Sequence, residues 1–358
     1  MTTALRCRDC GTTFEDRWRC TCGSPLDFVD QPLPDGPTPP EVDRDRGLWA
    51  FDGFLPVGRE VTLGEGWTPL VDAGAWDATF KLEYVFPTGS FKDRGAATTL
   101  SRAVELGVET VVEDSSGNAG AAIATYAARA GVDARIYVPA GVKASKLRAI
   151  ERAGATPVRI EGSRENVTAA CIDAVESETG WYASHAWNPA FFAGTATFAF
   201  EIAAQRGWSV PDAVVTPLGH GTLFLGAYRG FRALRDTGWT DRVPVLLGAQ
   251  AAGYAPIADA LHGTDEETEP NEIADGIQIR EPVQREAILA AVDDTGGDAI
   301  ALDRESVERE LDALHARGFY TEPTCAVAPA ALSEFRESGV VDADDDVVVA
   351  LTGSGLKG

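Results

Sequence analysis

The stretch that decides the fold is Pro87-Thr88-Gly89-Ser90-Phe91-Lys92-Asp93-Arg94-Gly95, which stands between a predicted strand and a predicted helix. We predict strands at 79–83, 110–113, 134–138, 156–160, 213–216, 243–247 and 347–351, and helices at 92–106, 118–130, 143–153, 164–178, 221–235 and 304–316. The strands are nearly continuous in Val and Ile, which indicates burial on both faces. Their alternation with helices predicts a parallel α/β architecture.

Ligands in such sheets bind beyond the carboxyl ends of the strands, so the loops after the strands are where chemistry is expected. Lys92 opens the predicted helix that follows one of these loops. A lysine amine can form an imine with an aldehyde cofactor and later act as a base. An isolated lysine would more simply be a surface residue in the first turn of a helix. Because the chain has only five lysines, and because of the residues that flank this one, we favour the functional interpretation.

Three further loops follow strands and contain small or hydroxyl residues. Asp114–Gly120 offers backbone N–H groups at a helix start, which suits a carboxylate, although an ordinary helix cap explains it equally well. Pro217–Leu223 has two glycines that let the backbone approach a phosphate. Leu351–Gly358 places the Thr352 hydroxyl at a strand end, where a glycine-rich tail is the alternative explanation.

These stretches together resemble the tryptophan-synthase β-like group of pyridoxal phosphate enzymes, also called fold type II. Within that group they are most similar to the threonine synthases. The matching segments are PTGSFKDRG, SSGNAG, the glycine loop and the ending TGSGLK, and the resemblance covers roughly residues 60–358. It implies two three-layer parallel-sheet domains and a lyase that converts O-phosphohomoserine and water to threonine and phosphate.

The resemblance also implies roles for single residues. Lys92 is the implied Schiff-base lysine and proton-transfer group. Cofactor contacts are implied at Asn118, Gly219, His220, Gly221, Thr222 and Thr352, and substrate contacts at Ser115, Ser116, Gly117 and Thr197. A packed or solvent-facing side chain remains the simpler explanation of His220.

The first residues form a separate unit with four cysteines. Cys7-x-x-Cys10 and Cys20-x-Cys22 match the pattern of a four-thiolate zinc ribbon. Tetrahedral zinc closes a fold that is too small to bury a core, and four protein ligands leave no open position for catalysis. We therefore expect structural zinc at Cys7, Cys10, Cys20 and Cys22. Free thiols, or a site that has lost its metal, remain the alternatives.

The expected domain organisation follows from these segments. Residues 1–30 form the zinc ribbon, and 31–45 form a proline-rich linker. Residues 46–95 together with 196–358 form the larger, cofactor-binding domain. Residues 96–195 form the smaller domain, which contacts the substrate.

The sequence departs from the threonine synthases at one place. These usually have NP-x-R followed by G-x-K-T, and here Phe191 replaces the arginine and Ala196 replaces the lysine. In the family both cations help bind the phosphate of O-phosphohomoserine, and a dianion needs positive charge around it. His185 precedes this stretch, where pocket lining and core packing are equally good explanations.

Other functions therefore stay open. The nearest is a related β-elimination or β-replacement enzyme that acts on serine, threonine, diaminopropionate or a cysteine precursor. A remote alternative is a non-catalytic regulatory scaffold, and the intact Lys92 and Asn118 argue against it.

Composition limits the partners and the compartment. The net charge of −24 repels nucleic acid and anionic membranes, so we expect neither as a partner. No apolar stretch approaches the ~18 residues that a membrane helix needs, and the start lacks an apolar signal region, so we expect a cytoplasmic protein. Excess acid with few lysines indicates a halophilic, high-salt cytoplasm, although a merely acidic protein is the simpler alternative. The family resemblance implies a homodimer.

Overall fold

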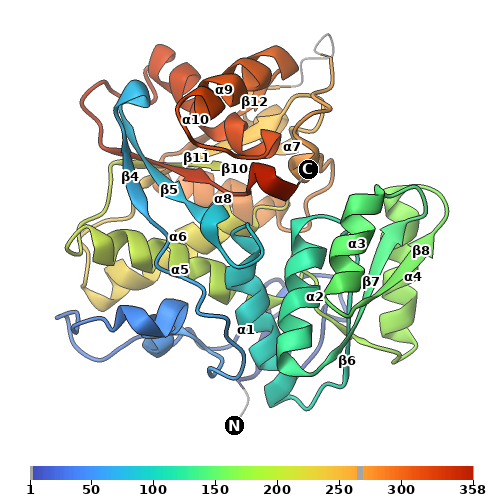
Figure 1. Cartoon of the computed structure of the whole chain (residues 1–358). Coiled ribbons are helices and arrows are strands. Elements are labelled where there is room, and N and C mark those ends of the chain that lie inside the picture. Colours follow the sequence, from blue (N-terminus) through green and yellow to red (C-terminus); the bar gives the residue numbers. More distant parts are fainter. Residues whose placement is uncertain (1–2, 264–268, 358) are drawn as a thin grey trace. The chain divides into compact units, whose positions relative to one another are not determined.

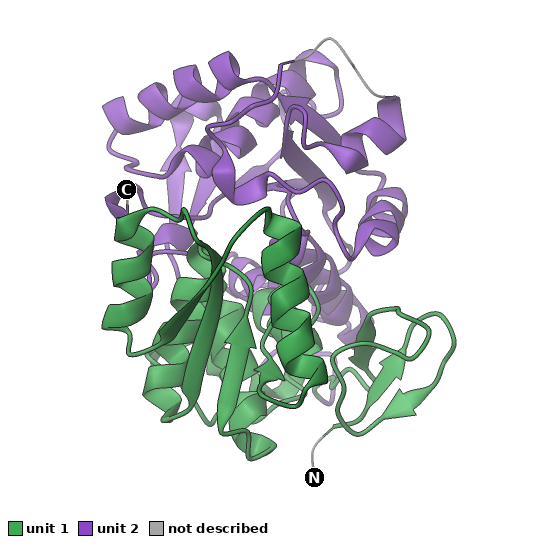
Figure 2. Cartoon of the chain, turned by 90° about the vertical axis from the view of Figure 1, so that its right-hand side faces the viewer, with its two compact units in different colours: residues 1–34, 43–66, 92–195 green, residues 35–42, 67–91, 196–358 purple. Residues whose placement is uncertain are grey.

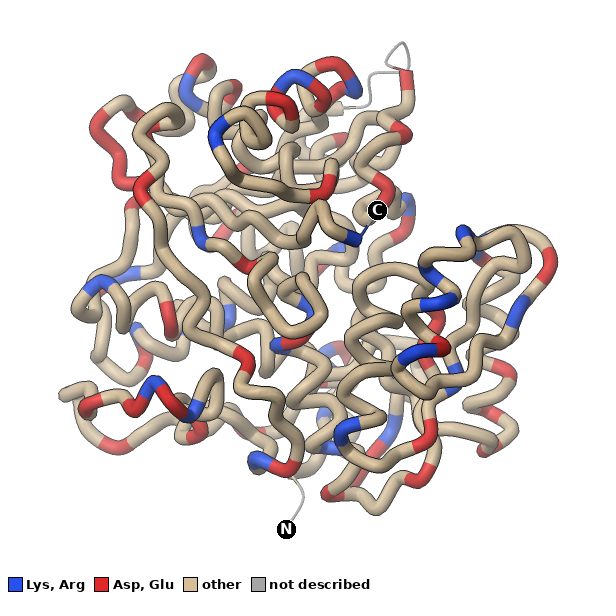
Figure 3. Tube along the Cα trace, viewed as in Figure 1, with Lys and Arg blue, Asp and Glu red and all other residues tan. Residues whose placement is uncertain are grey.

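The computed structural model describes residues 3–263 and 269–357. The chain divides into two compact units (Figure 2). Unit 1 comprises residues 1–34, 43–66 and 92–195, and unit 2 comprises residues 35–42, 67–91 and 196–358. The proline-rich stretch expected as a linker is thus shared between the two units. The chain has 55 acidic and 31 basic residues, and both kinds are spread along the trace (Figure 3).

Unit 2 is built on a six-stranded sheet with the strand order β12-β11-β10-β13-β5-β4 (Figure 1). The strands are β4 (Leu70–Ala73), β5 (Ala78–Leu82), β10 (Ala213–Pro217), β11 (Val245–Ala251), β12 (Asp298–Leu302) and β13 (Val347–Leu351). All neighbours pair in parallel except β4, which is antiparallel to β5. The parallel α/β architecture expected from the sequence is confirmed, and β4 adds an antiparallel strand at one edge. The β4–β5 connection is only the short 3-10 turn Gly74–Trp76, and a parallel crossover needs a much longer one.

Helices cover both faces of this sheet. They are α6 (Thr222–Thr237), α7 (Pro256–His262), α8 (Arg285–Thr295), α9 (Arg304–Ala316) and α10 (Pro323–Glu337), together with the end of α5 (Pro189–Gln205). Helices α9 and α10 lie on one face, and α6 and α8 lie on the other (Figure 1). This explains why β10 and β13 are buried along their whole lengths and why their sequences are continuously apolar.

Unit 1 contains a four-stranded parallel sheet with the order β8-β7-β6-β9. The strands are β6 (Thr110–Glu113), β7 (Asp133–Pro139), β8 (Thr156–Ile160) and β9 (Trp181–Tyr182), and the helices are α1 (Lys92–Glu105), α2 (Asn118–Ala130), α3 (Ala144–Arg152) and α4 (Arg164–Glu176). The chain moves outward from β6 to β8 and then returns, so that β9 lies on the other side of β6. The strand order therefore reverses between β6 and β9, which is where open α/β sheets bind ligands.

The first residues of unit 1 form a small antiparallel sheet. Its strands are β1 (Leu5–Cys7), β2 (Thr13–Phe14) and β3 (Leu26–Phe28), in the order β2-β1-β3. Its core contains only Leu5, Cys7, Cys20 and Leu26 with two partly buried phenylalanines. Single-turn or irregular 3-10 segments complete the chain at Arg44–Phe54, Glu83–Val85, Asp275–Ile277 and Gly355–Lys357. Within the described residues, no helix combines the length and apolarity that crossing a membrane would require.

Candidate active site

In unit 2, three neighbouring parallel strands end in the loops singled out by the sequence. Strand β13 lies between β10 and β5. Residues 218–221 follow β10, Thr352 follows β13, and residues 83–91 follow β5 and lead to Lys92. Parallel strands present their carboxyl ends at one edge, so the fold gathers these loops at a single edge of the sheet.

The glycine loop after β10 has no room for side chains. A Cβ atom on Gly219 would lie 3.2 Å from Ile277, and one on Gly221 would lie 2.5 Å from the side chain of Ile288. Gly221 also has a φ of 77°, which favours glycine. It caps α6 without a side-chain hydrogen bond, so the helix starts with backbone N–H groups rather than a capping hydroxyl. Such a helix start fits a phosphate group.

Thr352 is buried beside Cys325. Its hydroxyl oxygen lies 3.4 Å from Cys325 Sγ, and the same sulfur accepts a hydrogen bond from the Gly353 N–H at 2.9 Å. Burial, above all, raises the pKa of the Cys325 thiol to about 12, which keeps it protonated. Cys325 is thus a fully buried small residue that supports the strand end holding Thr352.

The segment before Lys92 is tied to the carboxyl-terminal segment. The Phe91 N–H donates to the Thr352 carbonyl at 3.1 Å, and the Ser354 N–H donates to the Gly89 carbonyl at 2.9 Å. Between them the Ser90 hydroxyl is fully buried and has no hydrogen-bond partner among the described residues. A buried, unsatisfied hydroxyl costs free energy, and a bound polar group would relieve that cost. This edge of unit 2 therefore fits a polar cofactor.

In unit 1, Lys92 is the first residue of α1. The next residue, Asp93, is buried and accepts a hydrogen bond from the Tyr126 hydroxyl, which also contacts Glu65 at 3.2 Å. Burial, and then the two carboxylates, raise the pKa of Tyr126, so the hydroxyl remains a donor. These contacts fix the turn of helix that carries Lys92.

The loop after β6 is held tightly. The Gly117 N–H donates to Ser115 Oγ at 3.3 Å, and the Ser115 carbonyl lies so close to Gly120 that any Cβ atom there would overlap it. The Asp114 carboxylate accepts hydrogen bonds from Tyr182 at 2.9 Å and from Thr168 at 2.6 Å. The first turn of α2, which begins at Asn118, is thus anchored from two other elements.

The structure adds a pair that sequence analysis missed. Glu113, the last residue of β6, is fully buried, and its Oε1 lies 2.7 Å from His185 Nδ1. Burial, and then the neighbouring Asp114, raise the pKa of Glu113 well above its ordinary range, although Lys92 and Arg164 oppose this. In the sequence, the feature that could have indicated Glu113 is an acidic residue at the end of a mostly apolar strand.

Phe191 and Ala196, which stand where cations were expected, are buried and apolar in the structure. The Phe191 ring packs on Gly95, where any Cβ atom would overlap it. Its centroid lies 6.1 Å from that of the His185 ring. Neither side chain therefore contributes charge. The His185 imidazole lies beside Phe191, which stands where the arginine was expected.

The four N-terminal cysteines converge. Their Sγ atoms all lie within 4.8 Å of one another. The individual separations are 3.6 Å for Cys7 and Cys22, 3.4 Å for Cys10 and Cys20, and 3.8 Å for Cys10 and Cys22. Four thiolates around zinc, each about 2.3 Å from the metal, would lie about 3.8 Å apart. The cluster fits a tetrahedral metal ion.

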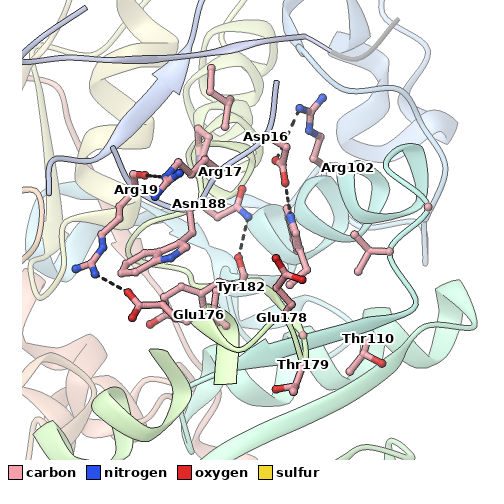
Figure 4. A pocket seen from close by; sticks show the side chains of 18 of the residues that line it. Asp16, Arg17, Arg19, Arg102, Thr110, Glu176, Glu178, Thr179, Tyr182 and Asn188 are labelled. Atoms are coloured by element: carbon pink, nitrogen blue, oxygen red, sulfur yellow. Dashed lines mark hydrogen bonds and ion pairs between the residues drawn. The ribbon is translucent and has the colours of Figure 1, made fainter. Parts of the chain in front are cut away.

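A cavity of about 870 Å³ lies in unit 1, between the N-terminal residues Asp16–Arg19 and the region around β9 (Figure 4). Some of its charged side chains form ion pairs with one another, and Arg102 lies 4.0 Å from Asp16. Arg19 contacts Glu176 at 2.6 Å, and the Trp181 indole donates to Asp16 at 2.8 Å. The cavity is lined by none of the predicted catalytic or cofactor-binding residues, so we do not assign the reaction to it.

Fold and site together define the class of protein. Residues 61–353 match the family described as pyridoxal-phosphate dependent enzyme, and the chain belongs to this family.

The chain is 34% identical to the threonine synthase of Methanocaldococcus jannaschii, with 98% of this chain and 92% of that protein covered. It is 33% identical to the threonine synthase of Methanosarcina acetivorans, with coverages of 99% and 92%. Among solved structures, maize serine racemase matches with a TM-score of 0.68 and 22% identity, over 80% of this chain and 88% of that one. This last likeness concerns the fold alone.

Proposed function

We propose that the chain is a threonine synthase, which converts O-phosphohomoserine and water to threonine and phosphate. The observation that carries this proposal is that two relatives named threonine synthase align with nearly the whole chain at 33–34% identity. The TGSGLK ending and the cysteine-rich N-terminal unit agree with it.

The residues assigned to the cofactor are those named from the sequence. Lys92 would hold the aldehyde group of the cofactor, and Asn118 would donate to its phenolic oxygen. Its phosphate would be held at the start of α6 by Gly219, His220, Gly221 and Thr222. The Thr352 hydroxyl would serve its pyridine nitrogen. When bound, the cofactor supplies an electron sink for negative charge that develops on the substrate carbon.

The chain's own groups then bind the substrate and move its protons. Ser115, Ser116 and Gly117 present hydroxyl and N–H donors to the substrate carboxylate, and Thr197 contributes a further hydroxyl. The Lys92 amine would take the proton from Cα of the substrate and return protons later in the reaction. Its place in the first turn of α1 favours the neutral amine, because a helix N-terminus disfavours a cation.

One observation favours a second candidate. The buried Phe191 and Ala196 supply no charge for a phosphate, which suits β-elimination or β-replacement on serine, threonine, diaminopropionate or a cysteine precursor. The sequence relationship to the two threonine synthases favours the first proposal over this one.

We also propose zinc in the cysteine cluster, a homodimer, and adaptation to high salt. The sulfur geometry supports the zinc, and the net charge of −24 supports the adaptation. About one zinc per chain in the purified protein, lost in Cys10→Ser, is the expected result of elemental analysis. A melting temperature that does not rise in molar salt contradicts the adaptation, and a monomer by light scattering contradicts the dimer.

The test of the main proposal follows the visible absorption of the lysine-bound cofactor and the release of phosphate. The proposal predicts that O-phosphohomoserine changes the absorption band and yields threonine and phosphate in equal amounts. Lys92→Ala should lose both the band and the products. An absorption band that does not change with O-phosphohomoserine but changes with serine or diaminopropionate supports the second candidate instead.

A further inference from the structure

The loop after β6 is fixed at its first residue by two side chains of unit 1. Asp114 Oδ1 accepts a hydrogen bond from the Tyr182 hydroxyl at 2.9 Å, and Asp114 Oδ2 accepts one from the Thr168 hydroxyl at 2.6 Å. Residues 115–117 come directly after it and are the ones assigned to the substrate carboxylate. Because both carboxylate oxygens are bonded, the two hydroxyl groups set where this loop starts.

Tyr182 is well suited to hold the loop. It is the last residue of β9, it pairs with Val112 of β6, and it is only 3% exposed. Burial, and then the charge of Asp114, raise the pKa of the tyrosine hydroxyl well above its ordinary range, so this group remains a hydrogen-bond donor. The strand pairing therefore brings a permanent donor to the start of the loop.

A tryptophan from the N-terminal residues packs on this tyrosine. The ring centroid of Trp18 lies 5.4 Å from that of Tyr182, with 76° between the ring planes. The Trp18 ring also packs edge-on against Trp187, at 5.1 Å and 78°. Edge-to-face pairs are a favoured arrangement of aromatic rings. The position of the Tyr182 ring therefore depends on a residue that lies outside the sheet.

Trp18 is itself held from two directions. It stands two residues before Cys20, a member of the cysteine cluster. The guanidinium of Arg19 lies 4.2 Å from the centroid of the Trp18 ring, and it forms an ion pair with Glu176 of α4 at 2.6 Å (Figure 4). The cysteine-rich segment and α4 thus both limit the movement of the indole.

The contact between the two rings borders the cavity of unit 1. Trp18 and Tyr182 both line this cavity of about 870 Å³. When the indole is truncated, the tyrosine ring gains space into which it can turn. Its hydroxyl would then lose the 2.9 Å spacing to Asp114 on which the start of the loop depends.

We propose that Trp18 and Tyr182 are positioning residues that act through Asp114 and hold residues 115–117 in the geometry that binds the carboxylate of an amino acid. The N-terminal cysteine-rich unit thereby supports substrate binding in addition to its own fold. The proposal deepens the function proposed above and rests on it for the role of the loop. Because both residues act through Asp114, they affect substrate binding more than the chemical step.

The experiment compares the wild type with Tyr182→Phe, Trp18→Ala, Trp18→Phe and the double variant that combines Trp18→Ala with Tyr182→Phe. Kinetics give kcat and KM for O-phosphohomoserine. Titration with alanine, which has the same carboxylate but no group to eliminate, gives a dissociation constant from the absorption of the cofactor. Thermal unfolding checks that each variant is folded, and Trp18→Leu serves if Trp18→Ala is not.

Unit 2 offers a matched control for each change. Tyr228 donates to Asp294 at 2.8 Å in an exposed pair, so Tyr228→Phe removes the same kind of hydrogen bond. Trp208 packs edge-on against Trp239 with 5.0 Å between the ring centroids, so Trp208→Ala removes the same kind of aromatic contact. Both controls should leave KM and the alanine dissociation constant within about twofold of the wild type.

Tyr182→Phe should raise KM and the alanine dissociation constant by about fivefold, the factor that corresponds to the net contribution of one hydrogen bond. The value of kcat should change by less than about twofold, because a carboxylate is bound alike in the ground state and the transition state. Trp18→Ala should raise both constants by about two- to tenfold, the range of one aromatic pair, and Trp18→Phe should restore most of the loss.

The double variant tests the connection between the two residues. Its effect should be no larger than about that of Tyr182→Phe alone, because both changes act through the same hydrogen bond. Effects that add in full would contradict the proposed role of Trp18. Unchanged alanine binding in folded Tyr182→Phe would overturn the inference as a whole.

Failure of the proposed function gives a different result. In that case the wild type makes no threonine from O-phosphohomoserine. The alanine dissociation constant would still rise in Tyr182→Phe and in Trp18→Ala, and the inference about the loop would stand.

Discussion

Two buried carboxylates, one in each unit, differ in how completely they are bonded. Glu201 of unit 2 lies 2.9 Å from Lys81 Nζ and also accepts the Thr68 N–H, while Lys81 donates further to Thr68 O and Gln205. Glu113 of unit 1 has the same complete burial but bonds an imidazole through one oxygen only. The first is a hydrogen-bonded ion pair that supports the fold, whereas the second leaves Oε2 without a hydrogen-bond partner among the described residues.

The largest loss of stability is expected when the Glu201–Lys81 pair of unit 2 is broken. Glu201→Gln should lower the free energy of unfolding by about 3–5 kcal/mol, because it removes the counter-charge that contacts the buried Lys81 ammonium. Urea unfolding in a fixed salt concentration measures the change. The control is Lys81→Met combined with Glu201→Leu, which removes both charges and should recover most of the loss. A negligible effect of Glu201→Gln would show that the pair is not a structural support.

Glu113→Gln should have a smaller effect on stability, about 1 kcal/mol or less in mildly acidic solution, since it preserves shape and replaces a carboxyl group whose pKa is raised in the folded protein. The effect should depend on pH. Because the pKa of Glu113 is raised in the folded state, the wild type binds the extra proton when folded, and it loses stability as pH rises from the unfolded toward the folded pKa.

The measurement is the melting temperature at pH values between the unfolded and the folded pKa of Glu113. The melting temperature of the wild type should decline relative to that of Glu113→Gln as the pH rises. Parallel curves for the two proteins would mean that the carboxyl group is ionised in the folded protein throughout.

The smallest loss of stability is expected when an exposed ion pair is broken. Arg304 and Glu308 lie one helical turn apart on α9, with a 2.8 Å contact and side chains 61% and 48% exposed. Glu308→Gln should cost about 0.3–0.5 kcal/mol at low salt and still less in molar salt, where screening is strong. A loss comparable to that of Glu201→Gln would remove the contrast between buried and exposed pairs.

Sequence patterns predicted the parallel core well. The strands at 110–113, 156–160 and 347–351 have the expected bounds, because each is short and is bounded by glycines or charged residues that mark loops. The strand expected at 243–247 lies instead at Val245–Ala251, since Gly248 and Gln250 hid its end. The edge strand β12 was missed, and its alternating exposure explains the weak signal.

The site was less accessible from sequence. Motifs identified Lys92, the 115–118 loop and the glycine loop, because each follows a strand. The Glu113–His185 pair joins residues 72 positions apart, and its pairing depends on β9 returning beside β6. Strand order of this kind is a property of the assembled sheet and leaves no local pattern in the chain.

The central claim is that Lys92 carries the cofactor. The most direct test is to reduce the purified protein with borohydride, which makes the lysine–cofactor bond permanent, and to locate the modified peptide by mass spectrometry. The account predicts one modified residue, Lys92, among the five lysines of the chain. Modification at Lys81, Lys143, Lys146 or Lys357 instead, or no modification after the cofactor is added, would contradict it.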